Sequence, residues 1–220
     1  MIDVVYLCAG KGIRAGLGYP KQYGLLGGVP TFVHGLRVLQ AMPEIDNIVV
    51  VCNDQPQVNE ICTTFGITKV VTMEGGTERQ DSVWVGVSII QSKYVLVMES
   101  ARPFVTEELV RRVIHTEGDI VTPWLPCKSS VLHRGGVFHD RERIGEIQTP
   151  QKFKTQLLCA AHKMRTGCHP NTKYTDDTQM LYRLMGLVPT VVDGEEQNIK
   201  ITTPLDVVIA RAICESNSNR

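Results

Sequence analysis

The most constraining stretch of this chain is its beginning, residues 2–23, which read IDVVYLCAGKGIRAGLGYPKQY. An apolar run at residues 4–7 is short enough to form a buried strand, and a glycine-rich loop follows it. That loop carries four glycines within nine residues: Gly10, Gly12, Gly16 and Gly18. Glycine lets backbone N–H groups approach a ligand closely, and successive N–H groups form a concave site for anions. Because Arg14 and Lys21 add positive charge, the stretch predicts a cradle for a triphosphate.

Known glycine motifs fit this loop poorly. A Walker P-loop needs Gly-Lys followed by Ser or Thr, which is absent here. In the dinucleotide motif G-x-G-x-x-G, this chain has Ala15 where the third glycine belongs. Since alanine is sometimes accepted there, a dinucleotide-binding fold remains a competing interpretation, as does an ordinary glycine turn after a strand.

Apolar patterns along the rest of the chain alternate between strand and helix. Strands are expected at residues 48–52, 69–72, 94–98, 119–124 and 189–192, and helices at residues 31–42, 57–65, 106–116, 154–164 and 204–214. This alternation predicts a mostly parallel sheet with helices on both faces, whose ligands bind at the carboxyl ends of the strands. With 220 residues, 43% of them hydrophobic, the chain suits one α/β domain. An irregular segment at residues 125–148, with a turn at Gly135-Gly136, indicates a projecting hairpin.

Six motifs in order resemble the alditol-phosphate cytidylyltransferases, a family that includes 2-C-methyl-D-erythritol 4-phosphate and ribitol-phosphate cytidylyltransferases. They are C-A-G-x-G-x-R at residues 8–14, P-K-Q-Y at 20–23, G-G-x-x-R-x-x-S-V at 75–83, Q-T-P-Q-K-F at 148–153, T-D-D at 175–177 and N-I-K-x-T-x-P-x-D at 198–206. The resemblance covers nearly the whole chain. It implies a single Rossmann-like nucleotidyltransferase domain over residues 1–215, with a dimerisation β-arm at about 126–148 and a disordered tail at 216–220.

The same resemblance implies a role for each matching residue. The nucleotide-binding residues would be Cys8, Ala9, Gly10, Gly12, Gly76, Arg79 and Ser82. The catalytic cations would be Arg14, Lys21, Lys200 and Arg141. Among the nucleotide-binding residues, Gly76 and Ser82 would hold the cytosine and ribose of CTP. Arg141 would reach from the arm into the partner's acceptor site, although it also fits an ordinary surface arginine. Asp206 would stabilise the last helix.

Two departures from the family pattern stand out. Where the family has H-D-A-A-R-P, this chain has Met98 and Glu99 in place of the histidine and aspartate. The resemblance implies that Glu99 binds Mg²⁺ and borders the acceptor, and glutamate keeps the oxygen ligands that magnesium needs. A metal held mainly by substrate and water is the alternative. On the arm, the acceptor-side D-T reads Ser129-Ser130, which leaves Ser130 as an acceptor-binding candidate and the acceptor's identity open.

The adjacent carboxylates of T-D-D allow two interpretations. Asp176 and Asp177 have the residue types of a metal pair or an acid/base pair. A helix N-terminus is the favoured interpretation, with Thr175 as the cap and both carboxylates facing the positive end of the helix dipole.

Charge and cysteine content limit the partners. Basic and acidic residues balance at 23 each, so no overall field attracts nucleic acid or a membrane. No apolar run approaches the roughly 20 residues of a membrane span, and no secretory signal is evident at the N-terminus. Seven cysteines without C-x-x-C spacing indicate buried thiols in a reducing cytoplasm rather than disulfides or a zinc site. The family implies a homodimer.

The chemistry implied is attack of an alditol phosphate oxygen on the α-phosphorus of CTP, with pyrophosphate leaving. Since the nucleophile is already an anion, alignment and charge neutralisation suffice, and no general base is required. Three hypotheses follow. In the first, the acceptor is 2-C-methyl-D-erythritol 4-phosphate, for isoprenoid synthesis. In the second, the acceptor is ribitol or glycerol phosphate, for a cell-surface polymer. In the third, the chain is an inactive nucleotide-binding homologue.

Overall fold

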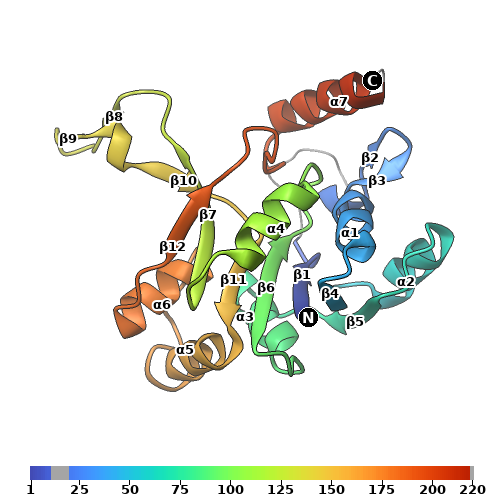
Figure 1. The fold of residues 1–220 in the computed structure, drawn as a ribbon, viewed down its shortest axis with the longest axis horizontal. Helices are drawn as coiled ribbons and strands as arrows, with labels where there is room; N and C mark the ends of the chain where they lie inside the picture. The colour runs from blue at the N-terminus through green and yellow to red at the C-terminus, as the bar shows by residue number, and fades with distance from the viewer. Residues whose placement is uncertain (11–19, 219–220) are drawn as a thin grey trace.

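The computed structural model describes residues 1–10 and 20–218, and its centre is an eight-stranded sheet (Figure 1). The strand order is β10-β7-β11-β6-β1-β4-β5, and β12 also pairs with β7. The strands are β1 Ile2–Leu7, β4 Ile45–Cys52, β5 Val70–Glu74, β6 Tyr94–Glu99, β7 Ile120–Pro126, β10 Gly145–Ile147, β11 Gln151–Lys154 and β12 Thr190–Asp193. Within this sheet, all strand pairs are parallel except those made by β10 and β11. The predicted mostly parallel α/β sheet is confirmed.

Helices cover both faces of the sheet, as the sequence predicted. One face packs against α1 Thr31–Ala41, α2 Gln55–Thr64 and α4 Glu107–His115, and the other against α3 Arg79–Val87, α5 Thr155–Cys168 and α6 Asp177–Met185. Side chains alternate along β1, so Val4 and Tyr6 enter the first core while Val5 and Leu7 enter the second. Because both faces are buried, the central strands read as continuous apolar runs.

The carboxyl ends of the central strands meet at one edge of the sheet. Leu7 pairs with Glu99 of β6 and with Val51 of β4, and Cys52 pairs with Glu74 of β5. The loops that follow these strands are therefore neighbours, where the fold class predicts a ligand site.

The strand β11 was not predicted from the sequence. Its four residues, Gln151–Lys154, run antiparallel between β6 and β7. A short segment with three polar residues lacks the apolar pattern of a buried strand. The polar groups find partners instead: Gln151 donates to Thr122, and the Lys152 ammonium donates to the carbonyls of Ile114 and Thr116 at the end of α4.

The predicted projecting arm is present and stands apart from the layered core (Figure 1). It contains the short antiparallel pair β8 Val131–Leu132 and β9 Phe138–His139, followed by a 3-10 turn at Arg141–Arg143. Its tip exposes apolar side chains, with Phe138 73% exposed. Leu132 and Val137 are exposed as well.

The last helix, α7 Pro204–Ser218, packs on the small hairpin of β2 Leu25–Leu26 and β3 Val29–Pro30. Its residues Val207 and Ala210 share a third apolar cluster with Leu26 and Ile201. The helix continues beyond the expected end at residue 214, so residues 216–218 are helical and the expected tail at 216–220 is wrong over these three positions. Across residues 1–10 and 20–218, no helix is long and apolar enough to cross a membrane.

Candidate functional site

A cleft of about 510 Å³ lies at the carboxyl ends of the central strands. It collects residues that the sequence singled out from segments far apart along the chain: Ala9, Gly10, Lys21, Gly76, Arg79, Ser82, Glu99 and Lys200. A larger hollow of about 840 Å³ lies elsewhere, between the start of β1 and the end of α4, and contains none of them. The cleft is therefore the candidate site.

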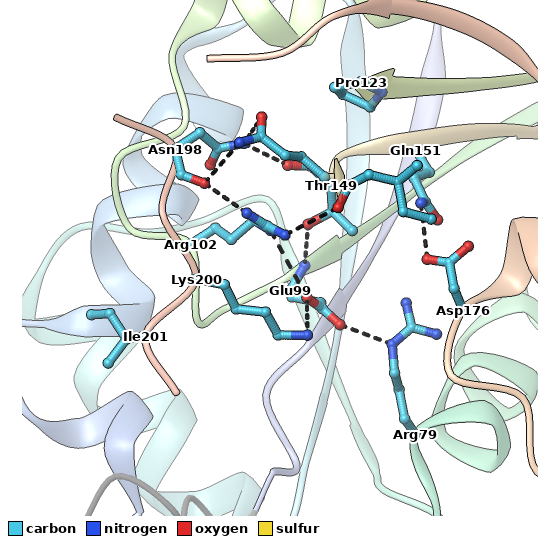
Figure 2. Close-up of polar contacts among 12 residues, drawn as sticks. Arg79, Glu99, Arg102, Pro123, Thr149, Gln151, Asp176, Asn198, Lys200 and Ile201 are labelled. Atoms are coloured by element: carbon cyan, nitrogen blue, oxygen red, sulfur yellow. Dashed lines mark hydrogen bonds and ion pairs between the residues drawn. The ribbon is translucent and has the colours of Figure 1, made fainter. Parts of the chain in front are cut away.

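Glu99, the last residue of β6, is the centre of the charges in the cleft (Figure 2). Its Oε1 lies 2.9 Å from Arg79 Nε, and its Oε2 lies 2.7 Å from Lys200 Nζ and 4.0 Å from Arg102 Nε. Burial alone would raise the pKa of Glu99, but Arg79 and Lys200 lower it to about 2. The carboxylate is thus ionised and holds several cations in place before any substrate charge arrives.

Arg79 has a second carboxylate partner that the sequence interpretation missed. Its Nη1 donates to Asp177 Oδ2 at 2.7 Å, whereas its buried Nη2 has no hydrogen-bond partner within residues 1–10 and 20–218. Asp177 is 1% exposed; burial raises its pKa, but Arg79 outweighs this and lowers it to about 2. The expected Thr175 cap is wrong, because Asp176 caps α6 by accepting from Thr178 N. Both carboxylates lie at the N-terminus of α6, as favoured from the sequence, and Asp177 is also part of the wall behind the site.

The turn after β5 is fixed by a close approach to the first loop. A Cβ on Gly75 would lie 2.4 Å from the Cβ of Ala9, so any side chain there would push the two segments apart. Gly76 N donates to Ser82 Oγ at 3.1 Å, and Ser82 Oγ is 3.3 Å from Glu78 O. Ser82 therefore holds the shape of the turn, while Glu78 is the N-cap of α3.

Lys200 is positioned by two buried amides that join its loop to the Q-T-P-Q motif. Gln148 Nε2 donates to Glu195 O at 2.9 Å, and Asn198 Nδ2 donates to Thr149 O at 2.9 Å. Asn198 O in turn accepts from Arg102 Nη1 at 2.7 Å (Figure 2). These bonds hold the N-I-K segment against the Q-T-P-Q segment. Asp206 Oδ2 accepts from the N–H groups of residues 202 and 203 at the start of α7, consistent with its expected role.

Lys21 enters the cleft from the other side, on the 3-10 turn Lys21–Tyr23. Its Nζ donates to Ile201 O at 2.6 Å, next to Lys200. The neighbouring Gln22 donates to Cys8 O, and Cys8 N donates to Val51 O. The backbone groups of Cys8 thus bond inside the protein, and Cys8, 1% exposed, does not line the cleft. The predictions on Gly12 and Arg14 lie outside the described residues.

The arm residues form a separate hollow of about 620 Å³. Ser129, Ser130 and Arg141 line it, and none of its lining residues belongs to the cleft. Within this protomer, the structure does not bring Ser130 and Arg141 together with the other predicted site residues.

Known proteins resemble this chain over nearly its whole length. The family model of 2-C-methyl-D-erythritol 4-phosphate cytidylyltransferase matches residues 2–216. Enzymes of that name from Bacillus velezensis and Syntrophus aciditrophicus are 33% and 36% identical, over 98% and 96% of this chain and 96% and 94% of theirs.

Solved structures show the same fold. That of 4-diphosphocytidyl-2C-methyl-D-erythritol synthase from Anaerococcus prevotii has a TM-score of 0.85 at 27% identity, covering 98% of this chain and 96% of the other. The 2-C-methyl-D-erythritol 4-phosphate cytidylyltransferase of Thermus thermophilus has a TM-score of 0.79 at 29% identity, covering 98% and 100%. This chain belongs to the 2-C-methyl-D-erythritol 4-phosphate cytidylyltransferase family.

Proposed function

We propose that this protein transfers CMP from CTP to 2-C-methyl-D-erythritol 4-phosphate, releasing pyrophosphate, as a step of isoprenoid synthesis. The observation that carries the proposal is the convergence of Lys21, Arg79 and Lys200 in one cleft at the carboxyl ends of the strands. A cleft lined by cations from separate segments suits a substrate with several phosphate groups. Family membership supports the same reaction.

In this mechanism the protein aligns two anions and stabilises the charge that develops between them. The acceptor phosphate attacks the α-phosphorus, and no residue has to remove a proton from it. Lys21 and Lys200, with Arg14 by its motif position, stabilise the transferring phosphoryl group. Consistent with this, no histidine from the described part of the chain lines the cleft.

The turn at Gly75-Gly76 is proposed to bind the nucleoside. Both bonds of the Ser82 hydroxyl are internal, so Ser82 supports recognition by holding the turn. The backbone groups of the turn, together with Ala9 and Gly10, are left to contact the base, ribose and phosphates. The Arg79 side chain, which is 23% exposed, lines this same cleft and adds a positive charge to it.

Magnesium is the proposed cofactor. Residues 1–10 and 20–218 hold no cluster of three or more His, Cys, Asp or Glu placed to share a metal ion. Mg²⁺, however, often takes only one or two carboxylates, with substrate phosphates and water completing its shell. Glu99, ionised in the cleft, fits that arrangement. When bound, the ion would neutralise triphosphate charge.

We further propose that residues 1–215 form one catalytic unit and that the arm at about 126–148 pairs two subunits. The arm exposes apolar side chains at its tip, and its hollow with Ser130 and Arg141 is separate from the cleft of its own subunit. Exchange of identical arms across a two-fold axis would cover those side chains and bring Arg141 to the partner's acceptor site. The seven cysteines are thiols rather than disulfides, which supports a reducing cytoplasm as the location.

A screen of purified enzyme tests the proposal. CTP, Mg²⁺ and a panel of alditol phosphates (2-C-methyl-D-erythritol 4-phosphate, ribitol 5-phosphate and glycerol 3-phosphate) are compared by pyrophosphate release. The expected result is the highest kcat/KM with 2-C-methyl-D-erythritol 4-phosphate. A preference for ribitol or glycerol phosphate would reassign the acceptor, as Ser129-Ser130 on the arm allows. No release with any acceptor would indicate an inactive homologue.

A further inference from the structure

A buried histidine lies behind the candidate site and has no place in the chemistry above. His162, on α5, is fully buried, and its ring stacks on Trp84 of α3 with centroids 5.7 Å apart. Within the described part of the chain, neither ring nitrogen makes a hydrogen bond. Buried polar atoms without partners are rare and costly, so a ring used only for packing would better be a phenylalanine.

The imidazole of His162 faces the carboxylate that holds Arg79. His162 Nε2 lies 3.6 Å from Asp177 Oδ1, while Asp177 Oδ2 accepts from Arg79 Nη1 at 2.7 Å. Arg79 Nε then contacts Glu99, and Glu99 contacts Lys200. One continuous row of polar contacts therefore joins the α5–α6 layer to the cleft.

Within this series of contacts, the orientation of the Asp177 carboxylate plane is the least constrained. An aspartate carboxyl group rotates easily about its last side-chain bond, because that torsion has broad energy wells. A single contact through Oδ2 does not fix the carboxylate plane, whereas a second contact through Oδ1 does. His162 Nε2 faces Oδ1 and needs to approach by less than 1 Å to reach about 2.9 Å, an ordinary hydrogen-bond length.

We propose that His162 is a positioning residue for nucleotide binding. Its Nε2–H donates to Asp177 Oδ1, which fixes the carboxylate plane and, through Oδ2, the guanidinium of Arg79. Arg79, whose side chain lines the cleft, is then held toward CTP in a single orientation. The inference rests on the proposed assignment of Arg79 to the nucleotide site.

Two substitutions separate positioning from packing. His162→Phe keeps a ring against Trp84 but removes the donor, whereas His162→Gln loses the ring but keeps an amide N–H at nearly the same distance from the backbone. Positioning predicts that Phe raises the KM for CTP by roughly fivefold to tenfold, with kcat and the acceptor KM within about twofold, and that Gln restores it. A purely structural role predicts the opposite order, with Gln the more harmful change. Leu158→Val, in the same helix and core, is the matched packing control.

A double variant tests whether His162 acts through Asp177. Asp177→Asn should raise the KM for CTP on its own, and adding His162→Phe should change it by less than about twofold more, since the effect of a shared pathway is not additive. If the double variant instead raised the KM for CTP by the product of the two single-variant factors, the inference would be overturned. Melting temperatures of all variants are measured in parallel. If His162→Phe does not fold, His162→Leu, which also lacks a donor, replaces it.

The outcomes also separate this inference from the proposed function. Pyrophosphate release by the unmodified enzyme with CTP and an alditol phosphate tests the function by itself. If the unmodified enzyme is active and His162→Phe leaves the KM for CTP unchanged, the positioning role is refuted while the proposed function stands.

Discussion

The charge on Glu99 is expected to stabilise the substrate-free protein. Glu99→Gln keeps the shape of the side chain but removes the carboxylate that neutralises Arg102 and Lys200, and leaves Arg79 with Asp177 as its carboxylate partner. In the folded protein the pKa of Glu99 falls from 4.5 to about 2, which corresponds to about 3 kcal/mol of favourable interaction with the ionised form. For a chain of this length, that loss lowers Tm by roughly 6–12 °C near pH 7.

The pH dependence gives this prediction a definite sign. Because the folded pKa is depressed, the stabilisation is fully present above about pH 4.5 and is lost as pH falls toward 2. The difference in Tm between the unmodified protein and Glu99→Gln should therefore shrink as the pH is lowered from about 7 to about 3.

Thermal unfolding without substrate, followed by circular dichroism at several pH values, measures both effects. Glu108→Gln is the matched control, because Glu108 pairs with Arg112 at 2.8 Å but is 82% exposed, and such pairs contribute little. A Tm gap for Glu99→Gln that is absent near pH 7, or that stays constant down to about pH 3, would refute the charge argument.

Four further results are expected. Lys21→Ala and Lys200→Ala should each lower kcat on the order of 100-fold while the circular dichroism spectrum is retained; near-normal turnover in both would remove the phosphate-binding assignment. CTP should be preferred over UTP, and ATP should fail; equal use of UTP would show that the turn at residues 75–76 does not read the pyrimidine edge. Glu99→Gln should weaken the dependence of rate on Mg²⁺ whereas Glu99→Asp keeps much of the activity, and an unchanged Mg²⁺ titration would give the carboxylate another role. Mixing Lys21→Ala with Arg141→Ala subunits should partly restore activity if the arm acts across the dimer; with subunit exchange verified, continued inactivity would place Arg141 outside the partner's site.

The sequence was sufficient for the parts of the structure that depend on local patterns. The apolar run of β1 and the helical spacing of α1 predict their elements, and the fold class follows from their alternation. Motif resemblance placed Lys21 and Lys200 in one site, and the structure brings both to the cleft.

Contacts between distant residues were not predictable in the same way. Asp177 binds Arg79 across 98 positions, and Asn198 binds Thr149 across 49, so no local period reports either contact. The paired carboxylates of T-D-D were visible and the favoured helix N-terminus is confirmed, but the bond from Arg79 to Asp177 appears only in the folded chain. The strand β11 was missed because the partners of its polar side chains lie on other elements.

Those polar side chains also determine how β11 can pair with its neighbours. Lys152 points toward the end of α4, while Phe153, on the opposite face, enters the core beneath α5 and α6. A slip of one residue along β6 would exchange the two faces, placing an ammonium group among Leu158 and Met180 and moving the phenyl ring to the carbonyls of α4. Burying an unpaired charge is far more costly than misplacing an apolar residue. The lysine thus penalises any alignment of β11 that is shifted by one residue against β6 and β7.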